Sequence, residues 1–117
     1  MRIFAVAARE ITVHASHAVV MDFLPRIART DGTRVSIARI GAGGTIGVHR
    51  GQIFAVVDGR GEVAAGGGPR RLIEAGQAAV WEPGEMHQSW ASVDMLVAIV
   101  ETAGEVELDE HFVEIHD

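Results

Sequence analysis

Residues 52–63 read QIFAVVDGRGEV and residues 75–87 read AGQAAVWEPGEMH, and these two stretches decide the fold. Each contains a short run rich in Val and Ala that is interrupted by a glycine-containing turn. Short β-branched runs between such turns are typical of antiparallel strands. The first stretch therefore predicts a strand over residues 52–57, a turn over 58–61 and a return strand over 62–65.

The same pattern continues along the chain, with turn signals roughly every 8–12 residues, as in all-β sandwiches and barrels. Glycine marks most turns, since the chain has 14 glycines and only 3 prolines. Near the N-terminus, the run Val19–Met21 favours a strand over a helix, because Pro25 would interrupt a helix there. Further strands are expected over residues 33–40, 70–73, 77–81, 87–91 and 95–101.

The composition of the 117 residues suits a single domain spanning residues 1–117, since 48% of them are hydrophobic and 22% are charged. The absence of cysteine excludes disulfides and thiolate chemistry and agrees with a cytoplasmic location. The sequence lacks an apolar run of about 18 residues, the length that a transmembrane helix needs. All ten basic residues are arginine, and they form no basic face, so we expect neither nucleic acid nor a membrane as a partner.

The net charge of −6 is concentrated at the end of the chain. Residues 1–100 contain ten Arg and nine acids, whereas residues 101–117 contain seven acids and no Arg. Apolar residues are interspersed with these acids, namely Val106, Leu108, Phe112, Val113 and Ile115. They predict that the acidic segment is an ordered covering strand or a short helix rather than a disordered tail.

The histidines are the candidate metal ligands in this cysteine-free chain. His49 follows the glycine-rich run 41–47, and His87 follows a Pro-Gly turn that places it at the start of a strand. His14 and His17 are three residues apart, so they would share a face of a helix but not of a strand. His49 and His87 are therefore the stronger candidates.

Around these two histidines the sequence resembles the cupin superfamily, over roughly residues 33–101. The first cupin motif is written G-x5-H-x-H-x3–4-E-x6-G. Its first glycine falls on Gly41, its two histidines on Gly47 and His49, its glutamate on Gln52 and its last glycine on Gly59. The chain thus departs from the motif at the first histidine and at the glutamate, and the interval from His49 to Gln52 is one residue shorter than the motif allows.

The second cupin motif, G-x5-P-x-G-x2-H-x3-N, matches better. Gly76, Gly84 and His87 agree with it in register, whereas Glu82 stands at the proline position and Ala91 at the asparagine position. Two motifs in the right order, embedded in strand-like sequence, predict an all-β fold. The resemblance implies that this is a jelly-roll β-barrel, or double-stranded β-helix, of two antiparallel sheets.

The resemblance also implies a metal site, since many cupins hold one divalent metal inside the barrel. Carried over by position, the ligands are His49, Gln52 and His87, and the ion is a divalent transition metal (Fe, Mn, Ni, Zn or Cu). Alternation along a strand would place Gly47 and His49 on one face. The set contains no carboxylate, so it neutralises a dication less well than the usual cupin ligands. The alternative is that both histidines are hydrogen-bonded polar residues of a metal-free cavity.

Five further residues are candidates for contact with a substrate. Four of them also have a plain structural interpretation: the two tryptophans as packing or dimer contacts, the glutamate as part of a solvated loop, and the arginine as an exposed residue of an edge strand. An inward-facing arginine would need an anion, such as a substrate carboxylate. The five candidates are Arg39, Phe54, Trp81, Glu85 and Trp90.

Three functions remain open on the sequence alone. The first is a metal-dependent enzyme of the oxygenase, isomerase or cyclase type acting on a small molecule, since all of these occur on the fold that the resemblance implies. The second is a metal-free cupin that binds or senses a small molecule without catalysis. The third is an assembly role as a homodimer, with apolar residues 3–8 and 18–24 supplying the contact.

Overall fold

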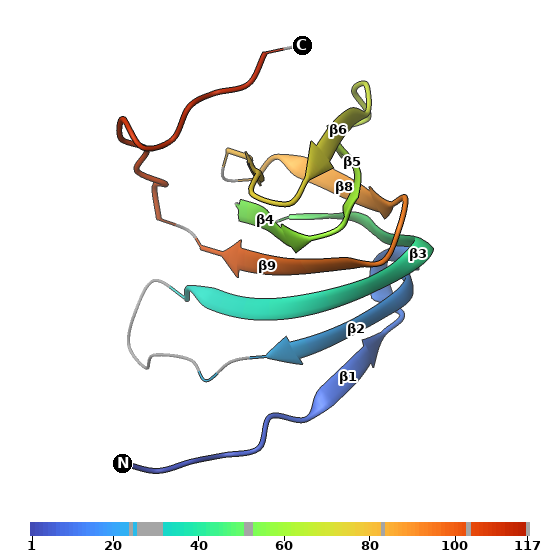
Figure 1. The fold of residues 1–117 in the computed structure, drawn as a ribbon, viewed down its shortest axis with the longest axis vertical. Helices are drawn as coiled ribbons and strands as arrows, with labels where there is room; N and C mark the ends of the chain where they lie inside the picture. Colours follow the sequence, from blue (N-terminus) through green and yellow to red (C-terminus); the bar gives the residue numbers. More distant parts are fainter. Residues whose placement is uncertain (24, 26–31, 51–52, 83, 103, 117) are drawn as a thin grey trace.

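The computed structural model describes residues 1–23, 25, 32–50, 53–82, 84–102 and 104–116, with the backbone alone described for residues 48–50. Within them the chain forms strands and one short 3-10 helix, η1 (Figure 1). In chain order the elements are β1 (Ala8–Ile11), η1 (Val13–Ala15), β2 (His17–Phe23), β3 (Arg34–Arg50), β4 (Ile53–Asp58), β5 (Arg60–Ala65), β6 (Arg71–Glu74), β7 (Ala78–Val80), β8 (Met86–Ala91) and β9 (Met95–Glu101). The strands expected from the sequence are confirmed with small shifts at their ends, except that the strand expected to end at residue 40 continues to Arg50 as β3.

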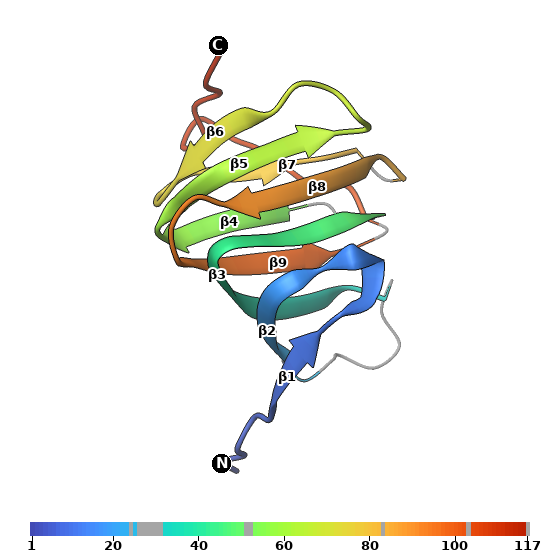
Figure 2. The ribbon, with the colours of Figure 1, turned by 90° about the vertical axis from the view of Figure 1, so that its right-hand side faces the viewer.

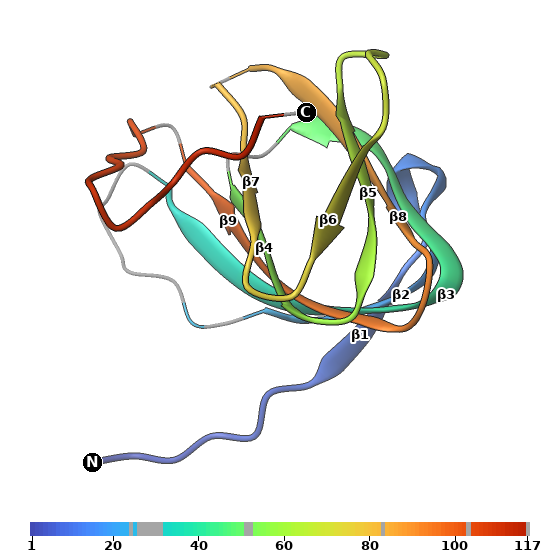
Figure 3. The same cartoon turned by 45° about the horizontal axis from the view of Figure 1, so that its top comes forward.

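All of these strands join one antiparallel sheet in the order β6-β5-β8-β3-β9-β4-β7, and β2 and β1 extend it from β3. The sheet curves until β4 approaches β6, so it forms a nearly closed barrel (Figures 2 and 3). The all-β jelly-roll prediction is therefore confirmed. Closure also leaves few exposed strand edges, which protects a sheet of short strands from pairing with other chains.

The long strand β3 belongs to both halves of the barrel. Its first half, residues 34–40, pairs with β9 on one side and β2 on the other. Its second half, from Thr45 onward, pairs with β8. The glycines between the two halves do not end the strand, and Gly44 lies where a Cβ would crowd the carbonyl oxygens of Gly41 and His17. Glycine therefore permits close backbone packing at this bend rather than marking a turn.

The turn at Gly59 is a corner between the two halves rather than a hairpin, so the expectation that residues 62–65 return beside residues 52–57 is wrong. β4 pairs with β7 and β9, whereas β5 pairs with β6 and β8. Gly59 has φ +87°, and a Cβ there would overlap the backbone carbonyl of Asp94. The turn signature reports the chain reversal correctly, but long-range pairing decides which neighbours each strand takes.

The core lies on the inner face of this barrel. Residues opposite each other in an antiparallel ladder share a face. Cross-strand partners such as Ile40 and Met95, or Ala38 and Val97, are buried together. The buried hydrophobic residues of the described chain form one cluster around these pairs.

The two ends of the chain lie outside this core. Residues 1–7 precede β1 and expose their large apolar side chains. Residues 104–116 form no strand and no helix, so the expectation of a covering strand or short helix in the acidic segment is wrong, and Leu108 and Phe112 are exposed. Among the described residues, no helix is long and apolar enough to cross a membrane.

Two glycines with the same φ angle allow the cost of a left-handed alanine to be measured with and without a steric overlap of its Cβ. Gly59 and Gly76 both have φ +87°, but a Cβ at Gly76 would meet open space. We expect Gly76→Ala to lower the free energy of unfolding by about 1–2 kcal/mol, the cost of a left-handed alanine. Gly59→Ala should cost clearly more, because it adds the overlap with the Asp94 carbonyl. Urea unfolding of the two variants tests this, and equal losses would contradict the corner geometry.

Candidate functional site in the barrel

The site is built around His87, near the start of β8. The preceding turn is closed by a hydrogen bond from the backbone N–H of Glu85 to the carbonyl of Glu82, 3.0 Å long, with Gly84 at φ +82°. Alternation along β8 then turns His87 and Ser89 to the inner face. His87 is 3% exposed, so the imidazole is held almost entirely away from bulk water.

Two aromatic rings hold the imidazole in place. The indole of Trp81 stacks on His87 with ring centroids 4.0 Å apart and ring planes 14° apart. Phe54 in turn meets Trp81 edge-to-face at 6.4 Å, and both aromatic residues are buried. Stacking uses the faces of the imidazole, whereas hydrogen bonding and metal coordination use its in-plane nitrogens. The stack therefore orients the ring without blocking those nitrogens.

His49 lies across from His87 in the backbone ladder between β3 and β8. A β-bulge shifts the register between Ile46 and His49, so the regular alternation that would place Gly47 and His49 on one face cannot be extended across it. A Cβ at Gly47 would overlap the carbonyl of His14 in η1, which explains why this motif position is glycine. The side chain of His49 lies outside the described part of the chain.

Gln52, the third ligand that the resemblance implied, lies outside the described residues altogether. Among the residues whose side chains are described, the buried polar ones are Ser36, His87 and Ser89. None of them is an acid, so the described interior is uncharged apart from any proton on the imidazole. The Ser89 hydroxyl is buried and has no hydrogen-bond partner among the described residues, and it is two positions along β8 from His87. Period-two alternation from His87 would have found Ser89 in the sequence.

Arg39 does not lie with this group. Its exposed guanidinium donates two hydrogen bonds to the carboxylate of Asp22, at 2.9 and 3.1 Å, on the face of β3 opposite the buried Ala38. The hydrogen bond and the charge of Asp22 both raise the pKa of Arg39. Arg34, five residues earlier on this strand, shares the parity of the buried Ser36 and Ala38, and its guanidinium lies 5.8 Å from the ring centroid of Phe23.

Glu85 also lies away from the buried imidazole. Its side chain is exposed, and its carboxylate accepts a hydrogen bond from the backbone N–H of Glu82 at 3.2 Å. This reciprocal contact makes Glu85 a turn-closing residue. His14 and His17 are exposed as well, in η1 and at the start of β2.

Trp90 faces the outer side of β8. The guanidinium of Arg70 lies 3.7 Å from the centroid of its ring and 3.6 Å from the carboxylate of Glu62. A cavity of about 500 Å³ adjoins this group, and its lining includes His87 as well as Trp90, Gln88 and the glycine turn 66–68. Among the predicted substrate contacts, Phe54 and Trp81 therefore lie with the buried ring of His87, and Trp90 lines this cavity together with His87. Arg39 and Glu85 lie elsewhere.

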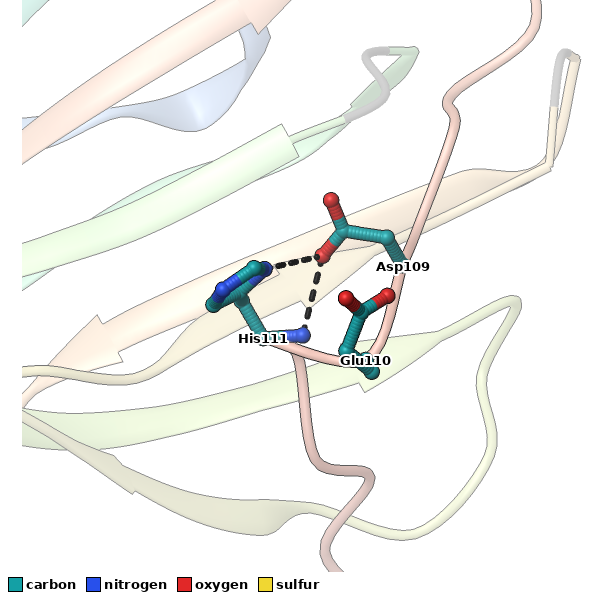
Figure 4. A group of neighbouring side chains, drawn as sticks. All are labelled: Asp109, Glu110 and His111. Carbon is teal, nitrogen blue, oxygen red and sulfur yellow. Dashed lines mark hydrogen bonds and ion pairs between the residues drawn. The ribbon is translucent and has the colours of Figure 1, made fainter.

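One group of potential metal ligands stands in the C-terminal segment, formed by Asp109, Glu110 and His111 (Figure 4). The three side chains are exposed. Asp109 accepts a hydrogen bond from the His111 backbone N–H at 2.9 Å and lies 3.1 Å from its Nδ1. These contacts describe a local turn of the chain, and the group lies outside the barrel.

Solved structures of known fold resemble this arrangement. They include a predicted oxalate decarboxylase from Thermotoga maritima, 19% identical over 83% of this chain and 93% of that chain with a TM-score of 0.70. KdgF from Halomonas sp. is 21% identical over 85% and 89%, with a TM-score of 0.66. An RmlC-like cupin from Shewanella frigidimarina is 16% identical over 92% and 89%, with a TM-score of 0.69.

These likenesses establish that the chain has the cupin fold, the small double-stranded β-helix that the two motifs predicted. Neither a family model nor a curated protein matches the sequence. At these identities the structural likeness defines the fold, while activity depends on the residues inside the barrel.

The two tryptophans offer a direct test of this geometry. In Trp90→Phe the remaining Trp81 is 6% exposed, and in Trp81→Phe the remaining Trp90 lies on the outer face. We expect acrylamide to quench the emission of Trp90 several-fold more strongly than that of Trp81, and Trp81 to emit at shorter wavelength. Equal quenching of the two variants would contradict the placement of Trp81 beside His87.

Proposed function

We propose that the protein binds a small organic molecule inside the barrel, at a divalent transition-metal ion held by His87 and His49, with Gln52 as third donor. The observation that supports this most directly is the pairing of the backbones of His49 and His87 across the β3–β8 ladder. The imidazole of His87 is buried and stacked on Trp81. The proteins of similar structure include a predicted oxalate decarboxylase, which agrees with small-molecule chemistry on this fold.

The chemistry of the donor set decides which ion suits the site. Imidazoles and an amide oxygen are neutral donors, and no acid is buried in the described interior. Imidazole suits Zn, Cu, Fe and Ni, whereas Mg, Ca and Mn prefer carboxylates. Three protein ligands leave room for a substrate atom on the metal, as in catalytic zinc sites. The residues present therefore fit a borderline transition metal and do not fit Mg or Ca.

The surroundings of His87 favour a flat or apolar ligand. Phe54 and Trp81 supply buried aromatic surface on one side of the imidazole, and Ser89 adds a hydroxyl on the same face of β8. An ion bound here would act as a Lewis acid on an oxygen of the ligand. The protein residues would orient the ligand on the aromatic wall and keep water from it, which strengthens every polar contact in the site.

A second candidate function, binding without metal, is favoured by the same lack of acidic side chains in the described interior. In that case His87 would hydrogen-bond the ligand directly, and ligand binding would stabilise the fold without any metal requirement. The two functions differ in one measurable property, the metal content of the purified protein.

Elemental analysis of the untagged protein, purified without chelator, tests the proposal. We expect about one transition-metal ion per chain, as for a single-site centre, and its loss in His87→Ala. His111→Ala is the matched control, since that imidazole is exposed in the C-terminal segment and should leave the metal content unchanged. Circular dichroism confirms that each variant is folded.

A spectroscopic readout makes the result specific to the barrel. Added Cu²⁺ or Ni²⁺ should quench the fluorescence of Trp90→Phe, in which Trp81 remains 4.0 Å from His87. The same ions should quench Trp81→Phe less. Absence of metal in the purified protein, together with no uptake on addition, would overturn the proposed metal site and favour the metal-free function.

A further inference from the structure

The cavity beside Trp90 lies on the outer side of β8, where the proposed metal site does not reach. Gln88 and Trp90 line it, and they alternate along β8 with the buried His87 and Ser89, so their side chains point to the opposite face of the strand. His87 belongs to the lining as well, but it is only 3% exposed and its ring is stacked on Trp81. A volume of about 500 Å³ is within the range of small-molecule sites.

The turn between β5 and β6 forms one wall of this cavity. Its Gly66 donates a backbone hydrogen bond to the carbonyl of Met86 at 2.6 Å, which fixes the turn beside the start of β8 (Figure 2). Gly66 and Gly67 have φ +49° and +80°, and a Cβ on either would meet no atom within 4 Å. The wall therefore carries no side chain at these positions, and the space next to it is open to a ligand.

Arg70 follows this turn and supplies the positive charge of the cavity. Its guanidinium lies 3.7 Å from the ring centroid of Trp90 and 3.6 Å from a carboxylate oxygen of Glu62. The second distance exceeds that of an N–H···O hydrogen bond. Within the described part of the chain the guanidinium makes no hydrogen bond, so its N–H groups remain available. The aromatic ring and the acid thus position a fork of donors that suits a carboxylate.

The rest of the lining limits which anion fits. Arg70 is the one arginine in it, and Met86 and Ala64 add apolar surface beside Trp90. Glu62 stands next to the guanidinium and would repel a ligand that carries a second negative charge. One cation beside an apolar surface therefore matches a molecule with a single carboxylate and an apolar body, rather than a phosphate or a dicarboxylate.

We propose that this cavity is a second ligand site, and that it takes a small monocarboxylate with an apolar body. The carboxylate accepts hydrogen bonds from the guanidinium of Arg70, and the apolar body rests against Met86 and the exposed part of Trp90. Gln88 offers an amide at the same face of β8. The site needs no metal and does not rest on the function proposed for the barrel interior.

Titrations followed by saturation-transfer NMR test the recognition of the carboxylate. We expect benzoate to bind at about millimolar concentration, as suits so small a ligand, and benzamide and inorganic phosphate to bind at least about tenfold more weakly. Arg70→Gln should weaken benzoate binding about tenfold, because it removes the charged donor. Glu62→Gln should tighten it several-fold, because it removes the competing negative charge. Arg39→Gln is the matched control, since that guanidinium is paired with Asp22 on another strand.

The two single-tryptophan variants locate the bound benzoate. It should change the emission of Trp81→Phe, in which Trp90 remains beside Arg70, and leave that of Trp90→Phe unchanged, in which the buried Trp81 remains. A chelator should not alter binding, and circular dichroism checks that each variant is folded.

Three results would overturn the proposal: benzamide or phosphate binding as tightly as benzoate, an unchanged affinity in Arg70→Gln, or a response confined to Trp81. A response of Trp81 that a chelator abolishes would place the ligand inside the barrel, in agreement with the proposed function but not with this second site. Absence of metal, in contrast, would leave benzoate binding at Arg70 as expected.

Discussion

The architecture depends on the pairing of β3 with three other strands. Over its first half β3 bonds to β2 and β9, and over its second half to β8, so this 17-residue strand sets the registers of both halves of the barrel. The bulge before His49 lies on the same ladder that joins the two halves. The pairing of β3 with β8 that closes the barrel thus also brings the backbones of His49 and His87 together. The position of the candidate site therefore follows from the strand pairing itself.

The positions of the strands could be predicted from the sequence because their signals are local: short β-branched runs and glycine turns. Their partners could not be predicted in the same way. The turn at Gly59 has the composition of a hairpin, yet β4 pairs with β9 and β5 pairs with β8, strands that come much later in the chain. The glycines of β3 mislead for the same reason, since cross-strand pairing outweighs the low strand propensity of glycine.

The candidate site was predictable where parity along a strand applies. His87 and Trp90 are three residues apart, so a regular strand sends them to opposite faces. In the structure His87 is buried with Ser89, whereas Trp90 alternates with them and lies under the guanidinium of Arg70. Parity does not say which face is the inner one, so the sequence alone does not exclude Arg39 from the interior; its contact with Asp22 on the exposed face does. The stack of Trp81 on His87 joins the residue that follows β7 to β8, and neither segment of the sequence carries a signal for it.

The uncharged interior constrains any chemistry that takes place there. A dication held by neutral donors keeps its full charge inside a barrel whose described buried polar groups are one imidazole and two hydroxyls. Burying an uncompensated charge is costly, and a low-dielectric site strengthens attraction to an opposite charge. Under the proposed function, an anionic oxygen of the ligand would therefore supply the charge that a glutamate supplies in the usual cupin motif. Metal and ligand would then stabilise each other's binding, so the lack of a carboxylate becomes a basis for selecting anionic ligands.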